Sequence, residues 1–330
     1  MARRIVVTGG GGFIGAYLVK RLVHDGWTVA VVDSMVRGDA SRFAEVADHV
    51  ELFTCDVRDQ AALEKAFVGA EVVMHLAAIN GTENFYTQPE LVLDVGMLGA
   101  LAVVNAGRVA GVPDLVVAST AEVYQTPAVV PTPETIPLML PDSLNPRYSY
   151  GGSKIVSELI AFNYAQNHYR QVQVFRPHNV FGPNMGWKHV EPQFIMRALA
   201  AKDAHPEGAA APFDVQGDGT ETRSFCYVDD VVEGIMLMYD RGGHREIYHI
   251  GSDEEISIRD LAGRIGKIVG VDLDIRSGAA PAGGTRRRCP DISKMRALGW
   301  SLDVGLDDGL ERTVDWYREH RNHRPANDLM

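Results

Sequence analysis

Short apolar runs and longer amphipathic runs alternate through the first half of the chain. The short runs are rich in β-branched residues, which is typical of strands buried on both faces of a sheet. They cover residues 5–7, 28–32, 50–53, 72–76, 115–118 and 172–175. The longer runs have a helical period and cover residues 14–24, 60–67, 89–110 and 150–169. This order predicts an α/β fold of the Rossmann type, with a doubly wound parallel sheet, right-handed crossovers and helices on both faces.

The pattern changes after Pro177. Gly, Pro and Ala interrupt residues 182–222, and the next expected elements are a helix at 228–239, a strand at 247–250 and a helix at 258–269. We therefore expect a smaller C-terminal α/β lobe, interleaved with the sheet, that binds substrate. The sheet domain is assigned to residues 1–178, with residues 226–251 returning to it, and the substrate-binding lobe to residues 179–225 and 252–330. The polar tail from His320 is expected to fray.

Composition narrows the class of protein. The chain has 330 residues, 46% of them hydrophobic, and 32 Lys and Arg against 43 Asp and Glu give a net charge of −11. An acidic chain without a basic block is not expected to bind nucleic acid, because that affinity comes from many Lys and Arg contacts with phosphates. No apolar run is long enough to suggest a membrane span. The three cysteines are far apart and the histidines lack ligand spacing, so we expect neither a disulfide framework nor a metal site, and a cytoplasmic location.

A glycine-rich loop at residues 8–15 follows the first expected strand and opens the first expected helix. Gly9, Gly12 and Gly15 satisfy a GxxGxxG spacing. Such glycines allow a tight turn and let the backbone approach a diphosphate at the N-terminus of a helix. Asp33 ends the second strand, where a carboxylate accepts hydrogen bonds from the ribose hydroxyls of NAD and repels the 2′-phosphate of NADP. The loop and Asp33 together predict an NAD site.

Tyr150 and Lys154 are four residues apart and therefore lie on one face of a helix. A neighbouring ammonium is expected to lower the pKa of the phenol from about 10 towards working pH, so that Tyr150 can exchange a proton with a substrate hydroxyl. The strand before it ends in Ser119 and Thr120, whose hydroxyls are placed to polarise the same substrate oxygen. This combination predicts the oxidation of an alcohol.

With these motifs, the chain resembles the extended short-chain dehydrogenase/reductase family of nucleotide-sugar epimerases and dehydratases over nearly its whole length. The further matching segments are residues 56–57, 75–78, 119–124, 176–183 and 223–230. For cofactor binding the resemblance implies Gly9, Gly12, Phe13, Ile14, Gly15, Asp33, Asp56, Val57, Leu76, Ala77, Ala78, Tyr150 and Lys154. For the substrate diphosphate it implies Asn179, Arg223 and Arg288, the last being the best match within residues 286–288. It also implies a homodimer through the helices at residues 89–110 and 150–169.

The chain departs from the family pattern at two positions. Gly96 replaces an Asn that usually gives water-linked support to the catalytic lysine, here Lys154. Ala121 replaces the Asp that sugar 4,6-dehydratases of the Thr-Asp-Glu type use to protonate the departing water, which disfavours that subtype. His178 and His249 lie in family loops near the expected pocket, where contact with substrate and a structural role are both open.

The family resemblance implies that Thr120 and Tyr150 bind the reacting sugar hydroxyl, normally at C4, and that NAD takes the hydride. We favour a nucleotide-sugar epimerase, because returning the hydride to the other face of the keto-sugar needs no further base. The alternative is a dehydratase or decarboxylase in which Glu122 acts as the base. Glu122 is equally consistent with local capping or pairing. Less favoured are an NAD-sensing regulator without turnover and a dehydrogenase of a non-sugar alcohol.

Overall fold

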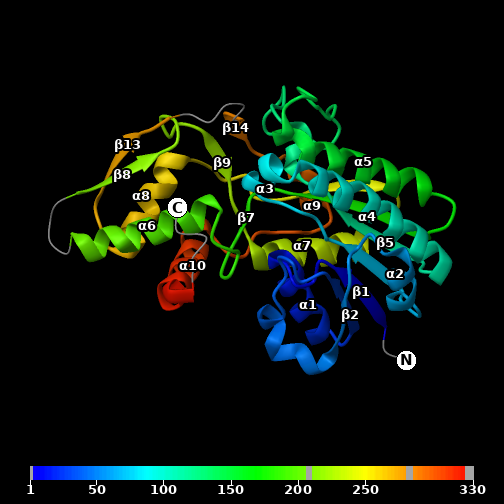
Figure 1. The fold of residues 1–330 in the computed structure, drawn as a ribbon. Coiled ribbons are helices and arrows are strands. Elements are labelled where there is room, and N and C mark those ends of the chain that lie inside the picture. Colours follow the sequence, from blue (N-terminus) through cyan, green and yellow to red (C-terminus); the bar gives the residue numbers. More distant parts are fainter. Residues whose placement is uncertain (1–2, 206–209, 280–284, 324–330) are drawn as a thin grey trace.

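The computed structural model describes residues 3–205, 210–279 and 285–323. Its main sheet has seven parallel strands in the order β11-β6-β5-β4-β1-β2-β3 (Figure 1). These strands are β1 (Arg4–Thr8), β2 (Thr28–Asp33), β3 (Val50–Thr54), β4 (Val72–His75), β5 (Asp114–Ala118), β6 (Gln171–Pro177) and β11 (Glu246–Ile250). The chain winds outward in both directions from between β1 and β4, which confirms the doubly wound Rossmann prediction and leaves a crevice at their carboxyl ends.

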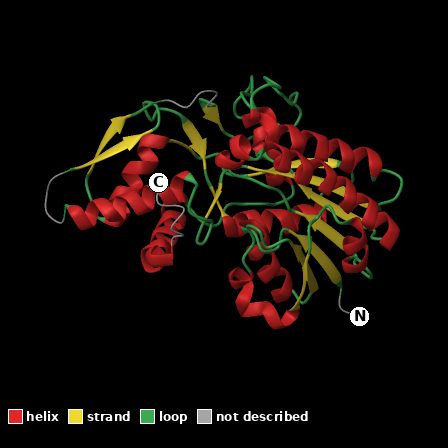
Figure 2. Cartoon of the chain, viewed as in Figure 1, coloured by secondary structure: helices red, strands yellow, loops and turns green. Residues whose placement is uncertain are grey.

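Helices cover both faces of the sheet (Figures 1 and 2). On one face lie α1 (Phe13–His24) and α7 (Val228–Arg241), which bury an apolar cluster against β1, β2 and β11. On the other face lie α2 (Gln60–Ala66), α4 (Pro89–Ala110) and α5 (Ser149–Tyr164), with a second cluster beneath them. The helix expected at residues 150–169 thus ends five residues early, at Tyr164.

The helix α4 is the one described helix that is long and apolar enough to cross a membrane by length and composition. It begins with a Pro in its first turn and ends at Gly111, which has a left-handed φ of 69°. It packs between α2 and α5, and 56% of its most apolar window is buried inside the protein. Its apolar character therefore fits a core helix of this fold.

One expected strand differs from its prediction. We expected the strand at residues 50–53 to be buried on both faces, but β3 is the outer strand of the sheet and three of its five residues are exposed. The prediction was wrong because β-branched and aromatic residues also suit an edge strand, and a strand pattern does not reveal its place in the sheet. The edge is short, which limits pairing with other chains.

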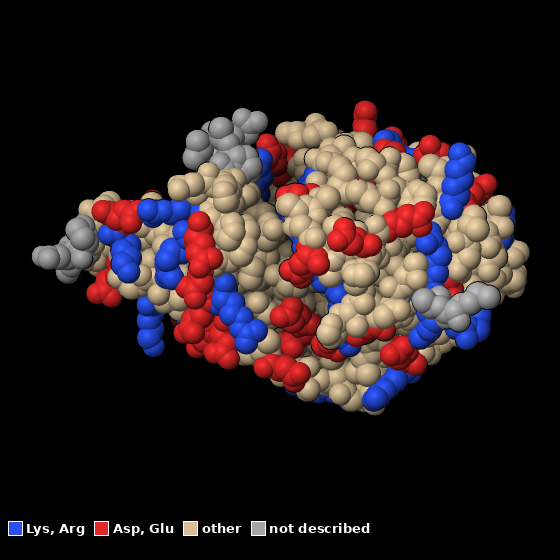
Figure 3. Space-filling view, turned by 90° about the horizontal axis from the view of Figure 1, so that it is seen from below, with Lys and Arg blue, Asp and Glu red and all other residues tan. Residues whose placement is uncertain are grey.

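The smaller lobe packs around its own apolar cluster (Figure 2). Its helices are α6 (Val190–Ala204), α8 (Ile258–Val269) and α10 (Leu306–His320). Its strands are β7 (Val180–Phe181), β8 (Ala211–Val215), β9 (Thr222–Ser224), β10 (Cys226–Tyr227), β12 (Glu255–Ser257), β13 (Leu273–Ser277) and β14 (Arg287–Arg288), which form three small sheets. On the face seen in Figure 3, acidic and basic side chains are interspersed among other residues.

Short elements complete the chain. They are the helices α3 (Thr82–Thr87) and α9 (Ser293–Ala297) and the 3-10 turns η1 (Ala40–His49), η2 (Ala121–Tyr124), η3 (Pro146–Tyr148) and η4 (Arg321–His323). The part of the expected frayed tail beyond residue 323 lies outside the described residues.

Residues 285–291 join the two lobes. Their segment β14 pairs with β9 of the smaller lobe. The same segment is bonded to the loop after η2: Thr132 N–H donates to the Cys289 carbonyl at 2.8 Å, and Asp291 N–H donates to the Thr132 carbonyl at 2.8 Å. The Thr285 hydroxyl donates to the Gln125 carbonyl at 2.9 Å. A late part of the chain thus crosses the crevice at the carboxyl ends of the main sheet.

Candidate active site

The glycine loop between β1 and α1 has the geometry of a diphosphate cradle. Gly9 has a φ of 76°, and a Cβ added to Gly15 would lie 2.2 Å from the Gly9 carbonyl oxygen, so the turn requires glycine at its closest approach. Gly12 is the N-cap of α1 and supplies no side-chain cap. The first N–H groups of the helix, at Phe13 and Ile14, are therefore available to an anion. The loop fits the diphosphate of a dinucleotide.

Asp33 lies beside this loop at the end of β2. One carboxylate oxygen accepts a hydrogen bond from Gly11 N–H and the other from Met35 N–H, both at 2.9 Å. These bonds fix the carboxylate, and each oxygen keeps a lone pair for a ribose hydroxyl. The structure thus places Asp33 where the sequence predicted the adenosine ribose.

The other expected cofactor contacts follow β3 and β4. Asp56 binds the side chain of Arg58 through both carboxylate oxygens, at 3.0 and 2.7 Å, and Val57 is buried against α4. Residues 76–78 follow β4 next to the glycine loop, where the Ala77 backbone would lie 2.7 Å from a Cβ on Gly9. All of these groups line the same carboxyl edge of the sheet.

The three residues with predicted catalytic roles come together at that edge. Tyr150 lies in the first turn of α5, and its hydroxyl is hydrogen-bonded to that of Thr120, which follows β5. One turn further along α5, Lys154 Nζ lies 6.0 Å from the centroid of the Tyr150 ring and donates to the Ala118 carbonyl at 2.8 Å. The side chains form a compact, buried set that holds a phenol, an alcohol and an ammonium.

The predicted effect of Lys154 on the phenol is wrong for this structure. Burial raises the pKa of Tyr150 to about 12, the Glu122 carboxylate adds to the rise, and the hydrogen bond with Thr120 opposes it. Burial lowers the pKa of Lys154 to about 8, although the Glu158 carboxylate opposes this. The spacing correctly predicted that the two side chains are neighbours, but desolvation by burial is the largest cause of both pKa shifts.

Gly96 reflects a close contact between α4 and α5. A Cβ on Gly96 would lie 2.5 Å from Ser153 Oγ, so an Asn has no room unless Ser153 moves. The Ser157 hydroxyl donates to the Gly96 carbonyl at 2.9 Å. Lys154 is supported instead by its direct bond to Ala118.

An aromatic side chain that sequence patterns did not single out covers the phenol. Phe85, on α3, stacks on Tyr150 with 5.3 Å between ring centroids and 9° between ring planes. Glu83 on the same helix forms an ion pair with Lys188 of the smaller lobe. A six-residue helix has no periodicity of its own, so the sequence offered no local signal for this contact.

Glu122 lies on the substrate side of Tyr150 within a group of arginines. Its carboxylate accepts from Arg288 Nη1 at 2.7 Å. Burial raises the pKa of Glu122, but the ion pair with Arg288 and the charges of Arg147 and Arg223 lower it further, so the pKa lies below its usual value. Glu122 is therefore held as a carboxylate, and its paired state makes it a weak base.

The predicted diphosphate residues are neighbours on the smaller lobe. Arg223 and Arg288 are in register on β9 and β14. Arg223 donates to the Thr222 and Thr285 carbonyls at 2.7 and 2.6 Å, and burial followed by the charge of Arg288 lowers its pKa to about 10. Asn179, at a φ of 38°, donates its amide to the carbonyl of residue 224 at 2.8 Å and ties the end of β6 to this lobe.

A buried polar network lies behind the residues with predicted catalytic roles. Glu158 binds Arg176 Nε and Nη2 at 2.8 and 2.6 Å and also accepts from the hydroxyl of residue 119. Arg176 donates to the Tyr124 hydroxyl, which bonds His249 Nε2 at 2.6 Å. His178 packs edge-on against His249, and both imidazole-bearing residues are at most 1% exposed. This burial favours a structural role for both histidines.

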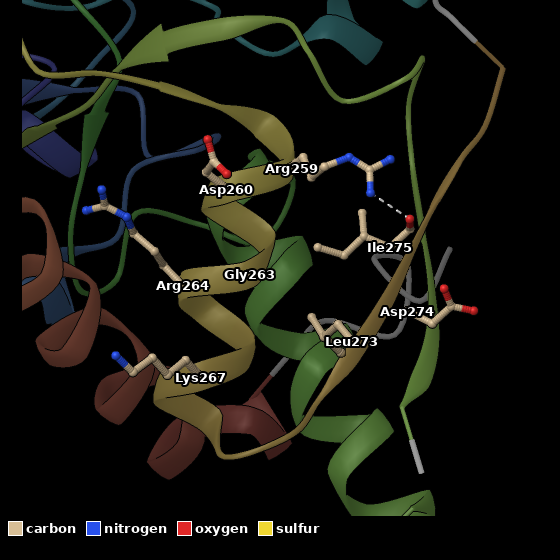
Figure 4. A pocket seen from close by; sticks show the side chains of 8 residues that line it. All are labelled: Arg259, Asp260, Gly263, Arg264, Lys267, Leu273, Asp274 and Ile275. Atoms are coloured by element: carbon tan, nitrogen blue, oxygen red, sulfur yellow. Dashed lines mark hydrogen bonds between the residues drawn. The ribbon is translucent and has the colours of Figure 1, made fainter.

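A further cavity of about 610 Å³ lies on the smaller lobe between α8 and β13 (Figure 4). Arg259, Arg264 and Lys267 line it together with Asp260 and Asp274, and Arg259 is tied to the carbonyl of residue 275 at 2.8 Å. None of its lining residues belongs to the predicted site. The predicted site residues lie elsewhere, along the carboxyl edge of the main sheet.

Comparison with known proteins identifies the family of the chain. Residues 5–251 match the model of the NAD dependent epimerase/dehydratase family. The chain is 30% identical over 333 residues to UDP-glucuronic acid decarboxylase 1 of Xenopus tropicalis, covering 99% of this chain and 75% of the relative. It is 31% identical over 324 residues to UDP-glucose 4-epimerase of Mycolicibacterium smegmatis, covering 96% and 98%. The structure of the dTDP-glucose 4,6-dehydratase DesIV of Streptomyces venezuelae, a double mutant with NAD bound, superposes with a TM-score of 0.86 at 30% identity, covering 97% and 98%.

Proposed function

Because the chain belongs to the NAD-dependent epimerase/dehydratase family, we propose that it is a nucleotide-sugar epimerase that inverts one carbon of the hexose, at C4. A keto-sugar would form and then be reduced on its other face. The relatives divide among epimerases, decarboxylases and dehydratases at similar identity. The choice therefore depends on the residues that surround Tyr150.

The observation that carries the proposal is the ion pair between Glu122 and Arg288 beside the catalytic phenol. Elimination of water from a 4-keto-sugar requires a base at C5 and an acid at C6. Glu122 is paired at 2.7 Å with a lowered pKa, and its neighbour Ala121 has no acidic group. Epimerisation needs neither group, whereas the set that it does need, Thr120, Tyr150 and Lys154, is assembled.

In this mechanism the phenolate form of Tyr150, which burial disfavours, removes the proton of the sugar hydroxyl and returns it in the second half-reaction. Thr120 shares the hydrogen bond with Tyr150 and would orient the same oxygen. NAD, when bound against the glycine loop and Asp33, supplies hydride acceptance and return. Lys154 places a buried positive charge beside the phenol, and the stacked ring of Phe85 excludes water from one of its faces.

A second candidate, a nucleotide-sugar decarboxylase, is supported by the same ion pair. A 4-keto-hexuronate is a β-keto acid, and the electrons of its C–CO₂⁻ bond move into the ketone as CO₂ leaves, so no base is required. The pairing of Glu122 therefore opposes dehydration more than decarboxylation. In this candidate Glu122 does not act as the base that was first considered for it. Glu122 serves only as the ion-pair partner of Arg288.

We also propose a homodimer through α4 and α5. The two helices lie side by side, and both carry exposed apolar side chains: Leu98 and Val109 on α4, and Leu159 and Tyr164 on α5. Light scattering after size-exclusion chromatography tests this arrangement. A monomer at micromolar concentration would contradict it.

The test of function is the fate of sugar nucleotides incubated with the purified enzyme without added NAD. We expect an isomer of unchanged mass, identified by NMR, and no accumulation of NADH, because the hydride returns to the sugar. A product that has lost CO₂ would favour the decarboxylase, and one that has lost water would contradict both candidates. Accumulation of NADH in proportion to product would indicate a dehydrogenase.

A further inference from the structure

Arg147 is an arginine of the active site to which sequence patterns assigned no role. It lies in η3, three residues before Tyr150, and its charge acts on the Glu122 carboxylate. Its backbone is fixed because its N–H is bonded to Asn145 Oδ1 at 3.0 Å. The sequence signal for it was only its position just before the catalytic tyrosine.

Two guanidinium groups in this cluster keep an unused donor. Among the described residues, Arg147 Nε and Arg288 Nε are buried and have no hydrogen-bond partner. Arg288 already donates through Nη1 to Glu122 at 2.7 Å and through Nη2 to the hydroxyl of residue 285 at 3.3 Å. A buried donor without a partner is costly, so both N–H groups are open to an acceptor on a ligand.

The position of these donors indicates which part of the ligand they meet. Arg223 is held on β9 by the carbonyls of its own small sheet, whereas Arg147 is joined directly to the start of α5, where Tyr150 acts. The charge of Arg147 acts on Glu122, beside the hydroxyl that is oxidised, and also on Arg223, so Arg147 faces the hexose as well as the predicted diphosphate residue. Guanidinium N–H groups bind a carboxylate more strongly than a neutral hydroxyl.

We propose that Arg147, together with the unused Nε of Arg288, binds a carboxylate on the hexose, so that the substrate is a nucleotide hexuronate. Arg288, which is paired with Glu122, then serves the hexose in place of the diphosphate for which the family resemblance implied it. This inference rests on the proposed function, because it assumes that Tyr150 oxidises the hexose of a sugar nucleotide. It does not depend on whether the carboxylate is retained, as in epimerisation, or lost as CO₂.

The experiment compares kcat/KM for matched pairs of sugar nucleotides, UDP-glucuronate with UDP-glucose and the corresponding dTDP and GDP pairs. We expect the wild-type enzyme to favour a uronate. Arg147→Gln should lower kcat/KM for that uronate roughly 10- to 100-fold, mainly through KM, because it removes a charged hydrogen bond made in both the ground and the transition state. The value for the neutral hexose should change by less than about twofold, and Arg147→Lys should recover part of the uronate activity.

Arg287→Gln is the matched control, because Arg287 is the neighbour of Arg288 on β14 but points to solvent and pairs with Glu255. It should leave the ratio of uronate to hexose activity unchanged. Preference for the neutral hexose, or an equal loss on both substrates in Arg147→Gln and Arg147→Lys, would overturn the inference. If the enzyme removes CO₂ from a uronate and this requires Arg147, epimerisation is overturned but the carboxylate-binding role of Arg147 stands. If the enzyme epimerises UDP-glucose and Arg147→Gln has no effect, the role of Arg147 is overturned but epimerisation stands.

Discussion

Replacing Glu158 with Gln tests how the buried network supports the catalytic lysine. The carboxylate accepts two hydrogen bonds from Arg176, and the two side chains are 4% and 2% exposed. Gln keeps the shape of the side chain but removes the charge, so a buried guanidinium loses its counterion. Breaking a buried ion pair on one side costs about 3–5 kcal/mol. For a protein with a total stability of about 5–15 kcal/mol, the variant should fold but melt roughly 6–20 °C below wild type.

Glu158→Gln should also change the pH dependence of kcat, which would not change if Glu158 had a purely structural role. Glu158 lies one turn after Lys154 and opposes the lowering of its pKa to about 8. In Glu158→Gln that pKa should fall further, so the ammonium is lost at lower pH and the alkaline limit of turnover moves to lower pH. Thermal melting and a profile of kcat against pH measure the two effects.

Two variants serve as controls for this prediction. Asp315→Asn removes a solvent-exposed ion pair with Arg318 and should leave the Tm nearly unchanged. Replacing Glu158 and Arg176 together with apolar residues of similar size should recover much of the Tm lost in the single variant. A Glu158→Gln enzyme with the melting temperature and pH profile of wild type would refute the reasoning.

Three further predictions concern the catalytic and cofactor residues. Tyr150→Phe should lower kcat by about 100-fold or more without changing the NAD content, and a loss smaller than about tenfold would show that another group moves the proton. Because the pKa of Lys154 is lowered to about 8 in the fold, the unfolded chain holds this proton more tightly. Relative to Lys154→Met, wild-type stability in urea should therefore rise by up to about 1.4 kcal/mol per pH unit between pH 8 and 10, and parallel curves would contradict this. Gly15→Ala places a Cβ 2.2 Å from the Gly9 carbonyl oxygen and should abolish NAD binding, measured by release of NAD on denaturation. A variant with a full complement of NAD would disprove the assignment.

The doubly wound parallel sheet could be predicted because each strand carries its own apolar run and the helices between them require right-handed crossovers. The order of the strands was not predicted. The helix α10 was missed although Leu306, Leu310, Val314 and Tyr317 are all buried along one face, a spacing typical of an amphipathic helix. The helix α6 had less signal, since a proline lies in its first turn among mixed polar and apolar residues.

At the site, motifs located residues that lie close together in the sequence or come directly after the end of a strand. Tyr150, Lys154 and Thr120 were found in this way. The pKa of Tyr150 was not, because desolvation depends on everything that packs around the ring, including Phe85 from a short helix about 65 residues earlier in the chain. Arg147 was missed because an arginine near the start of a helix is common in sequences. Only the structure shows that its charge acts on Glu122.

The segment at residues 285–291 has a consequence for how the site is completed. It brings Arg288 to Glu122, a partner 166 residues earlier in the chain, and it is bonded to Thr132 on the way. Contacts over such separations close large loops, which is slow in folding. The glycine loop and the first strands of the sheet can therefore form before Arg288 reaches Glu122, and the crossing segment then ties the two lobes together. The helix α3 adds a second link between the lobes through the ion pair of Glu83 with Lys188.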